Sequence, residues 1–111
     1  MEALRAALDP MILALLERQP DHGYSLMLRL RGQTGIEISD GSLYPALYRL
    51  EQAGKIEGSW ERAQTGHRRK VFTVTRKGKQ ILRKARVEWP KLAVVLERLL
   101  GGSSSDAPST T

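Results

Sequence analysis

Apolar residues recur at helical spacing in three stretches of the first half of the chain. The first stretch predicts a helix over residues 10–18 that starts at the Asp9-Pro10 pair, where a carboxylate can accept free backbone N–H groups. The same periodicity extends upstream through Leu4 and Leu8, which leaves open an extra turn or a whole helix before Pro10. The apolar positions of the predicted helix are Met11, Ile12, Leu15 and Leu16.

The second stretch predicts a helix from about residue 22 to residue 31. Its apolar stripe consists of Tyr24, Met27, Leu28 and Leu30. Gly32 and Gly35 follow the stripe, and glycine commonly ends a helix because it accepts the left-handed backbone conformation. We expect residues 36–38 to form a short extended bridge to the next element.

The third stretch predicts a helix over residues 40–53, capped at its start by Ser39 and ended by Gly54. Pro45 lies about one and a half turns into it, where the ring removes a backbone hydrogen bond. We expect the helix to survive with a bend, because Gly41 has no Cβ to crowd the ring.

The second half of the chain predicts a β-hairpin and a long helix. Residues 57–62 and 69–74 form the two strands, and residues 63–67 form the turn between them. Thr75 caps a helix over residues 76–100. Its apolar residues are spaced alternately by three and four, as in a coiled-coil seam: Leu82, Ala85, Trp89, Leu92, Leu96 and Leu99.

This order of elements indicates a mainly α fold with a small β-hairpin. Three helices, a hairpin and a long helix are the order of a winged helix-turn-helix domain with a dimerisation helix appended. We divide the chain into a winged domain over residues 1–75, a dimerisation helix over residues 76–100 and a disordered tail over residues 101–111.

The charge of the chain indicates what kind of partner it binds. The 111 residues carry 18 Lys and Arg against 12 Asp and Glu, a net charge of +6, and ten basic residues without one acidic residue lie between positions 62 and 87. Such a block favours a polyanion, and double-stranded DNA suits it best. Peripheral membrane binding is less favoured, because the cationic stretch lacks an apolar face of its own.

Composition also excludes several classes of protein. The chain has no cysteine, two isolated histidines and no motif that pairs a nucleophile with a base, so we expect no enzyme activity, no metal site and no cofactor. It has no apolar stretch of the roughly 20 residues that cross a membrane, and its N-terminus lacks a secretory pattern. We therefore expect a cytoplasmic protein.

The outward face of the helix over residues 40–53 is the first candidate for DNA contact. At about 100° per residue, its leucines face the core and leave Tyr44, Pro45, Tyr48, Arg49 and Gln52 outside. Tyrosines placed there can reach phosphates or stack on sugars, whereas the alternative is that they cover the edge of the core. We assign base readout to residues 39–48 and a phosphate contact to Arg49.

The hairpin tip is the second candidate. Arg68, Arg69 and Lys70 follow Gly66 at the end of the turn and can enter a minor groove or grip phosphates; the alternative is a solvated hairpin. Arg76, Lys77 and Lys79 open the last helix, where the helix dipole disfavours cations. Either an external anion or plain solvation offsets that effect.

Several segments resemble the PadR family of bacterial transcriptional regulators. They are residues 22–24 (His-Gly-Tyr), residues 41–51 (Gly-Ser-Leu-Tyr-Pro-Ala-Leu-Tyr-Arg-Leu-Glu), residues 66–70 and residues 73–78. The resemblance covers residues 8–99 and implies a homodimeric winged-helix protein. Because most members of the family are repressors, it also implies a repressor. It implies DNA contacts at Tyr24, Ser39, Ser42, Tyr44, Pro45, Tyr48, Arg68, Arg69 and Lys70.

The chain departs from the family pattern at two positions. Tyr48 stands where many members carry histidine, and Pro90 interrupts the last helix directly after Trp89. The resemblance to multidrug-sensing members makes Trp89 a candidate effector site for a small aromatic ligand. The alternative is that Trp89 is a large core residue that holds two protomers together.

Our prediction is a homodimeric repressor that docks two recognition helices in successive major grooves of an inverted-repeat operator. The rival interpretation is a winged-helix module that binds another protein through the recognition helix or through the apolar hairpin face around Trp60. That module would bind DNA weakly and without sequence preference. The operator, the regulated genes and the identity of an effector do not follow from the sequence.

Overall fold

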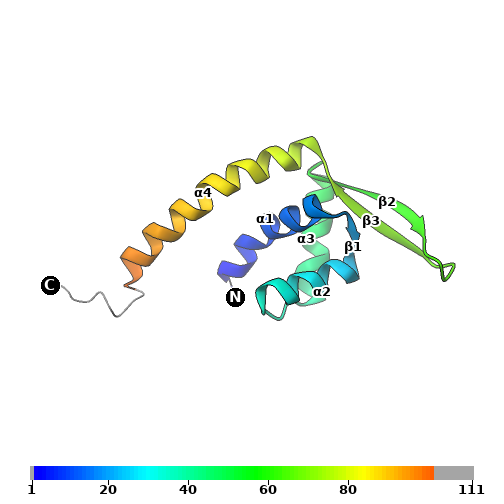
Figure 1. Ribbon diagram of the computed structural model, residues 1–111, viewed down its shortest axis with the longest axis horizontal. Helices are drawn as coiled ribbons and strands as arrows, with labels where there is room; N and C mark the ends of the chain where they lie inside the picture. Colours follow the sequence, from blue (N-terminus) through cyan, green and yellow to red (C-terminus); the bar gives the residue numbers. More distant parts are fainter. Residues whose placement is uncertain (1, 102–111) are drawn as a thin grey trace.

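The computed structural model describes residues 2–101 and contains four helices and a three-stranded sheet in that range (Figure 1). The elements are α1 (Glu2–Arg18), β1 (Asp21–His22), α2 (Gly23–Thr34), α3 (Asp40–Gln52), β2 (Ile56–Arg62), β3 (Arg68–Val74) and α4 (Arg76–Leu100). This order confirms the predicted winged-helix fold class. The predicted tail lies outside the described residues from position 102 onward.

Helix α1 starts eight residues before the predicted boundary, so the assignment of Asp9-Pro10 as a helix start is wrong. Pro10 lies inside α1. The upstream turns are held in place by packing, because Leu8 is buried in the same core cluster as Ile12 and Leu13. Proline removes only one backbone donor, and the burial of apolar side chains on both sides offsets that loss.

Helix α2 also runs beyond its predicted end. Gly32 lies inside the helix, and Gly35 is the residue that ends it, with a φ of 70° in the left-handed region. The Gly35 amide donates to the Arg31 carbonyl at 2.8 Å, as expected for a C-terminal cap. Thr34 extends the last turn, because its hydroxyl donates to the Leu30 carbonyl at 2.7 Å.

The sheet contains a short strand that the sequence pattern did not predict. Strand order is β1-β3-β2, with both pairs antiparallel. In β1, Asp21 lies opposite Phe72 and His22 opposite Val71. Strands β2 and β3 form the predicted hairpin, each starting one residue before its predicted boundary, and it projects from one end of the molecule (Figure 1).

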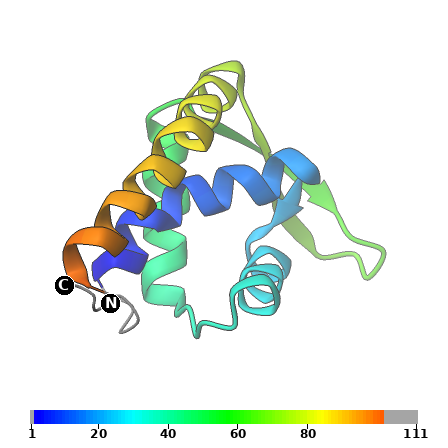
Figure 2. The same ribbon diagram turned by 60° about the vertical axis from the view of Figure 1, so that its left-hand side comes forward.

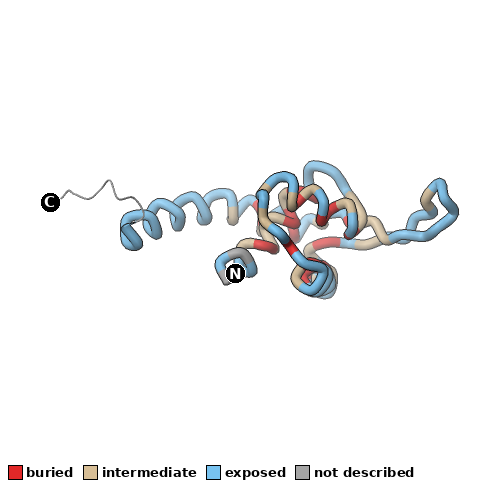
Figure 3. Tube along the Cα trace, turned by 90° about the horizontal axis from the view of Figure 1, so that it is seen from below, coloured by how far each residue is buried: buried red, intermediate tan, exposed pale blue. Residues whose placement is uncertain are grey.

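One core joins the three N-terminal helices to the sheet and to α4. Figure 3 shows the buried segments gathered in the body of the molecule, while the hairpin tip and the outer half of α4 are exposed. The fully buried side chains come from all three N-terminal helices, from the α2–α3 bridge and from β2: Leu8, Ile12, Leu13, Leu16, Leu26, Leu30, Ile38, Leu43, Leu47, Leu50 and Ile56.

Helix α4 belongs to the body only through its first turns. Gly78 and Leu82 are buried, whereas every residue from 86 to 100 is exposed. The helix continues through Pro90 without a break. Figures 1 and 2 show α4 passing α1 and then extending beyond the body, opposite the hairpin, which gives the chain principal extents of 64 × 27 × 21 Å.

Candidate DNA interface

Helix α3 divides into a buried face and an outward face, as its periodicity predicts. Leu43, Ala46, Leu47 and Leu50 are buried. Tyr44, Pro45, Tyr48 and Arg49 are all exposed, and Ser39 is exposed at the N-terminal cap position. The Ser39 side chain donates to the Ser42 hydroxyl at 3.3 Å, and its backbone carbonyl accepts from the Leu43 amide at 3.0 Å. The start of α3 therefore presents two neighbouring hydroxyls.

Two tyrosines of α3 lie on this outward face, and one tyrosine of α2 is exposed as well. Tyr48 is 64% exposed, and Tyr24, in the first turn of α2, is similarly exposed. The Tyr44 ring lies over Gly23, so closely that a Cβ atom at Gly23 would lie 2.6 Å from Cε1 of the ring. Gly23 thus lets the first turn of α2 approach α3, and Tyr44 bridges the two helices while it stays partly open to solvent.

Arg49 is tied to helix α1. Its guanidinium donates to Oδ1 of Asp9 at 2.9 Å, and both side chains are partly open to solvent. The pair links the outward face of α3 to α1 across 40 residues of chain. A phosphate contact by Arg49 would have to share the guanidinium with Asp9.

Arg68 and Arg69, the first two residues of β3, lie on opposite faces of the hairpin. The Arg68 guanidinium lies over the Trp60 ring, 5.3 Å from its centroid, which is within the range of a cation–π contact. Arg69 points to the other face, where a guanidinium nitrogen lies 3.3 Å from Nε2 of His22. Both arginines are exposed. The tip is therefore cationic on both faces, with an aromatic platform on one.

Lys70 has a different environment from the two arginines. Its ammonium donates to Oε1 of Glu51 in α3 at 2.8 Å, and it lies 5.6 Å from the centroid of the Phe72 ring. The Lys70 side chain is only 32% exposed and that of Glu51 25%. Of the three predicted wing contacts, Lys70 is the one that pairs with a carboxylate of α3.

A partly buried ion pair fixes the start of α2 beside the sheet. Asp21 accepts from the Arg29 guanidinium at 3.0 Å and from the His22 amide at 2.8 Å. Burial raises the pKa of the Asp21 carboxyl, but hydrogen bonds from Ser25, Arg29 and the His22 backbone outweigh burial, so the pKa lies below its ordinary value of 3.8. Arg29 also donates to the Leu15 carbonyl at 2.7 Å, which joins α2 to the end of α1.

One of the three cations at the start of α4, Lys77, has a structural partner that the sequence did not indicate. Lys77 donates to the Ala53 carbonyl at the C-terminal end of α3 at 2.9 Å. A cation suits that position, because the C-terminus of a helix carries partial negative charge. The Thr75 side chain accepts from the Gly78 amide at 3.2 Å, which confirms Thr75 as the cap of α4.

The predicted seam of α4 is exposed except at its first two positions. Leu82 is 2% exposed in a single chain and belongs to its core, so it is not available to a partner. Ala85 is half-buried. The remaining seam residues, Trp89, Leu92, Leu96 and Leu99, are exposed together with Val87, Val94, Val95 and Leu100.

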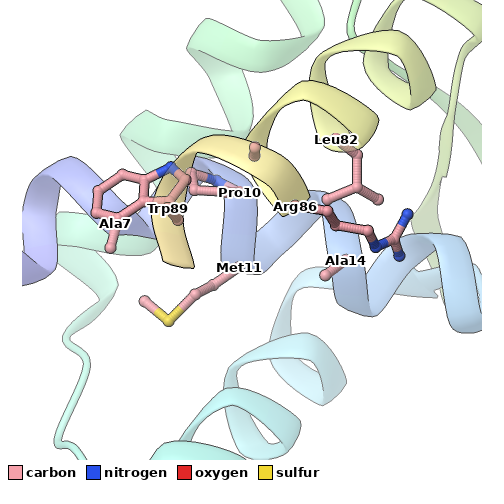
Figure 4. A pocket seen from close by; sticks show the side chains of 8 residues that line it. Ala7, Pro10, Met11, Ala14, Leu82, Arg86 and Trp89 are labelled. Carbon is pink, nitrogen blue, oxygen red and sulfur yellow. The ribbon is translucent and has the colours of Figure 1, made fainter. Parts of the chain in front are cut away.

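Trp89 borders an apolar groove between α1 and α4 (Figure 4). The groove has a volume of about 330 Å³ and is lined by Ala7, Pro10, Met11, Ala14, Leu82, Ala85, Arg86 and Trp89. Among these described lining residues Arg86 alone is charged, and its guanidinium donates to Glu17 of α1 at 2.7 Å. This hydrogen bond lowers the pKa of the Glu17 carboxyl below its ordinary value of 4.5.

The predicted DNA-contact residues fall into two groups, and each group has its own structural supports. The tyrosine and serine groups come from α2 and α3, and the arginines come from the hairpin that follows α3. Sequence reasoning missed Gly23, Asp9 and Glu51 as partners of predicted site residues. It named Trp60 only as an apolar surface, although alternation along β2 and β3 places Trp60 on the face of Arg68.

Two negative findings concern the described residues. Within residues 2–101, no three His, Asp or Glu side chains gather closely enough to hold a metal ion. None of the helices in this part of the chain has the length and apolar character needed to cross a membrane.

A helix pair with an outward tyrosine-rich face, followed by a basic hairpin, defines a winged helix-turn-helix DNA-binding protein. Sequence comparison agrees: the model of the "Transcriptional regulator PadR-like family" matches residues 12–84. The chain belongs to this family and is a DNA-binding transcriptional regulator.

Relatives cover nearly the whole chain. Transcriptional regulator Rv3488 of Mycobacterium tuberculosis is 34% identical over 110 residues, which cover 99% of this chain and 98% of the relative. A PadR family transcriptional regulator from Eggerthella lenta superposes with a TM-score of 0.78 at 31% identity, covering 92% of this chain and 88% of that one. A PadR-like transcriptional regulator from Bacillus cereus gives 0.80 at 28% identity, covering 93% and 100%.

Proposed function

We propose that the protein is a homodimeric repressor of the PadR family that binds an inverted-repeat operator. The observation that carries this proposal is the shared exposure of three features: the tyrosine face of α3, the two arginines of the hairpin and the apolar outer half of α4. The first two features suit a duplex, and the third suits a second copy of the chain. Repression rests on the resemblance to a family whose members are mostly repressors.

The dimer is supported by the outer half of α4. Side chains such as Leu92, Leu96 and Leu99 lie beyond the body, where no described part of the same chain covers them. Exposed apolar patches of this kind mark interfaces, and two identical helices can cover each other about a two-fold axis. The same axis would relate the two recognition helices and set them roughly 34 Å apart, one turn of the duplex.

For DNA docking, we assign α3 to the major groove and the hairpin to the backbone or the minor groove. Ser39, Ser42, Tyr44, Pro45 and Tyr48 supply contacts at and after the start of α3. Tyr24 reaches the duplex from α2, and Arg68 and Arg69 from the hairpin. Phosphate contacts by such cations make affinity fall with salt. Because the proposed target is chromosomal DNA, we also assign the protein to the cytoplasm.

We also propose that a small aromatic effector binds at Trp89. The apolar groove beside it, with a volume of about 330 Å³, is within the size range of ligand pockets. A ligand seated there would lie between α1 and α4, so it could change how one protomer meets the other. Fluorescence titration of a Trp60→Phe variant, in which Trp89 is the only tryptophan, tests this proposal. Absence of quenching by micromolar planar aromatic cations would remove it.

The main experiment is a random-oligonucleotide selection with the full chain. We expect enrichment of one sequence motif repeated in inverted orientation, with half-site centres about 10 base pairs apart or a multiple of that spacing. Enrichment of no motif would favour the rival function, a protein-binding module with nonspecific DNA affinity. Transcription in vitro from a promoter that carries the selected motif then decides the regulatory sign: added protein lowers transcript yield if it represses.

A further inference from the structure

We propose that Lys70 is a positioning residue that holds the wing against the recognition helix through Glu51, rather than a contact to DNA phosphates. This inference deepens the proposed function and rests on it for its DNA-binding readouts. It also changes the role that the sequence pattern assigned to Lys70, which stands in one cationic run with Arg68 and Arg69.

The first argument is geometric. Lys70 is on β3 and Glu51 is in the last turn of α3, yet the ammonium and the carboxylate are 2.8 Å apart. The side chains are 32% and 25% exposed, so the pair is partly withdrawn from water. Arg68 and Arg69, by contrast, are both exposed. A lysine that contacts DNA would have to leave the carboxylate.

The second argument is that the chain leaves a space shaped for this pair. Gly58 of β2 lies opposite Phe72 in the sheet, directly beneath the pair. A Cβ atom at Gly58 would collide with Cε of Lys70 and would lie 3.1 Å from Oε2 of Glu51. Glycine therefore opens a passage across β2 through which the Lys70 side chain reaches α3. A solvated phosphate-binding lysine would need no such passage.

The third argument concerns what the pair joins. Backbone hydrogen bonds link β2 to β3, but α3 and the hairpin are separate elements joined by the short segment over residues 53–55. The Lys70–Glu51 pair is a direct side-chain tie between α3 and the strand that carries the wing arginines. The Phe72 ring, 5.6 Å from the ammonium, supports the same orientation of Lys70. Losing the tie would let the wing move relative to the recognition helix.

The test compares Glu51→Gln, Lys70→Gln and the charge-reversed double variant E51K/K70E with the wild-type chain, on the selected operator and on random DNA. We expect each single variant to lose roughly tenfold in operator affinity, with little further loss when both are combined as E51Q/K70Q. Binding to random DNA and the slope of log K against log salt should stay at their wild-type values. The reversed pair should recover most of the operator affinity.

Arg69→Gln is the matched control, because Arg69 precedes Lys70 on the same strand. We expect this variant to reduce the salt slope by about 0.9, the effect of one lost phosphate contact. The proposal for Lys70 is overturned if Lys70→Gln reduces the slope in the same way, or if Glu51→Gln leaves operator affinity unchanged. It is also overturned if the single variants only lower the unfolding temperature and bind the operator normally while folded.

A measurement without DNA separates this inference from the proposed function. Hydrogen exchange of the hairpin amides in the free protein should be faster in Glu51→Gln and in Lys70→Gln than in wild type, and should return toward wild type in E51K/K70E. Unchanged exchange in both single variants would overturn the tie even if operator binding is found. Failure of the wild-type chain to prefer any operator would instead overturn the proposed function and leave the exchange result to decide the tie.

Discussion

Single residues shape the recognition surface, and Gly23 does so because it has no side chain. Its missing Cβ lets the Tyr44 ring rest on the first turn of α2. The contact involves the end of a flexible, partly exposed side chain, so a substitution at Gly23 can be relieved by swinging the ring outward. The fold would then survive while the surface changes.

We therefore expect Gly23→Ala to lower operator affinity several-fold and to change the free energy of unfolding by less than about 1 kcal/mol. Gly32→Ala is the control in the same helix, because a Cβ there would meet no described atom within 4 Å. Alanine should stabilise that helix position by about 0.5–1 kcal/mol and leave operator binding unchanged. Normal operator affinity of Gly23→Ala would contradict the role given to the Tyr44 ring.

Asp21 makes stability depend on pH. Its pKa is lowered in the folded protein, so the carboxylate contributes stability that is present above its unfolded pKa, ordinarily 3.8, and is lost as pH falls through the lower folded value. Asp21→Asn should lower the free energy of unfolding at pH 7 by about 1–3 kcal/mol, because Arg29 loses its charged partner. That difference should shrink at pH below 3.8.

Urea unfolding of both chains at pH 7 and at pH 3 measures the effect. Glu57→Gln, an exposed change on β2, serves as the control and should behave as the wild type at both pH values. A deficit of Asp21→Asn that is as large at pH 3 as at pH 7 would show that the carboxylate charge is not its cause.

At this scale the sequence predicted which side chains face outward but not what they touch. The buried face of α3 is confirmed, because helical periodicity fixes it locally. The partners of Arg49 and Lys70 lie 40 and 19 residues away. Such pairs depend on how elements pack, and no local spacing encodes that packing.

At the scale of elements, Gly78 controls how α4 leaves the hairpin. A Cβ atom there would collide with the backbone carbonyl oxygen of Lys55, which belongs to the segment between α3 and β2. The same carbonyl accepts from the Thr75 amide at 3.1 Å, so it cannot move away freely. The first turn of α4 is thus held against the loop that joins the recognition helix to the wing.

Gly78→Ala should lower the free energy of unfolding by about 1–3 kcal/mol, because backbone must shift to relieve the collision. Chemical denaturation measures the loss, with Gln80→Ala, an exposed change in the same helix, as the control. Equal denaturation midpoints for Gly78→Ala and wild type would refute this packing constraint.

Elements with a strong local signal could be predicted closely, and those defined by distant partners could not. The hairpin strands and α4 are found within one residue of their predicted bounds. Strand β1 was missed because two residues carry no periodicity and are a strand only through pairing with β3. The start of α1 was misplaced because the Asp9-Pro10 signal is local, whereas burial of Leu8 is decided by the whole core.

At the scale of the whole molecule, the proposed dimer depends on the outer half of α4. Leu96→Ser combined with Leu99→Ser should raise the dimer dissociation constant at least about a hundredfold, because each buried leucine contributes ~1.5–3 kcal/mol. Each monomer should stay folded, since both side chains are exposed in a single chain.

Sedimentation velocity across a concentration series measures this change, and circular dichroism checks the fold. Glu97→Ser, between the two leucines and outside the predicted seam, is the control and should sediment as the wild type. A wild-type chain that sediments as a monomer at micromolar concentration would refute the dimer and, with it, the fixed spacing of two recognition helices.

The bare outer half of α4 has a consequence for how a cell would use this regulator. If only the dimer binds the operator, two chains must associate before binding. At low abundance, promoter occupancy then rises with the square of the number of chains. A small drop in expression would then release the target gene sharply rather than gradually. Fifteen residues of helix that the body leaves uncovered would in this way set a threshold in gene dosage.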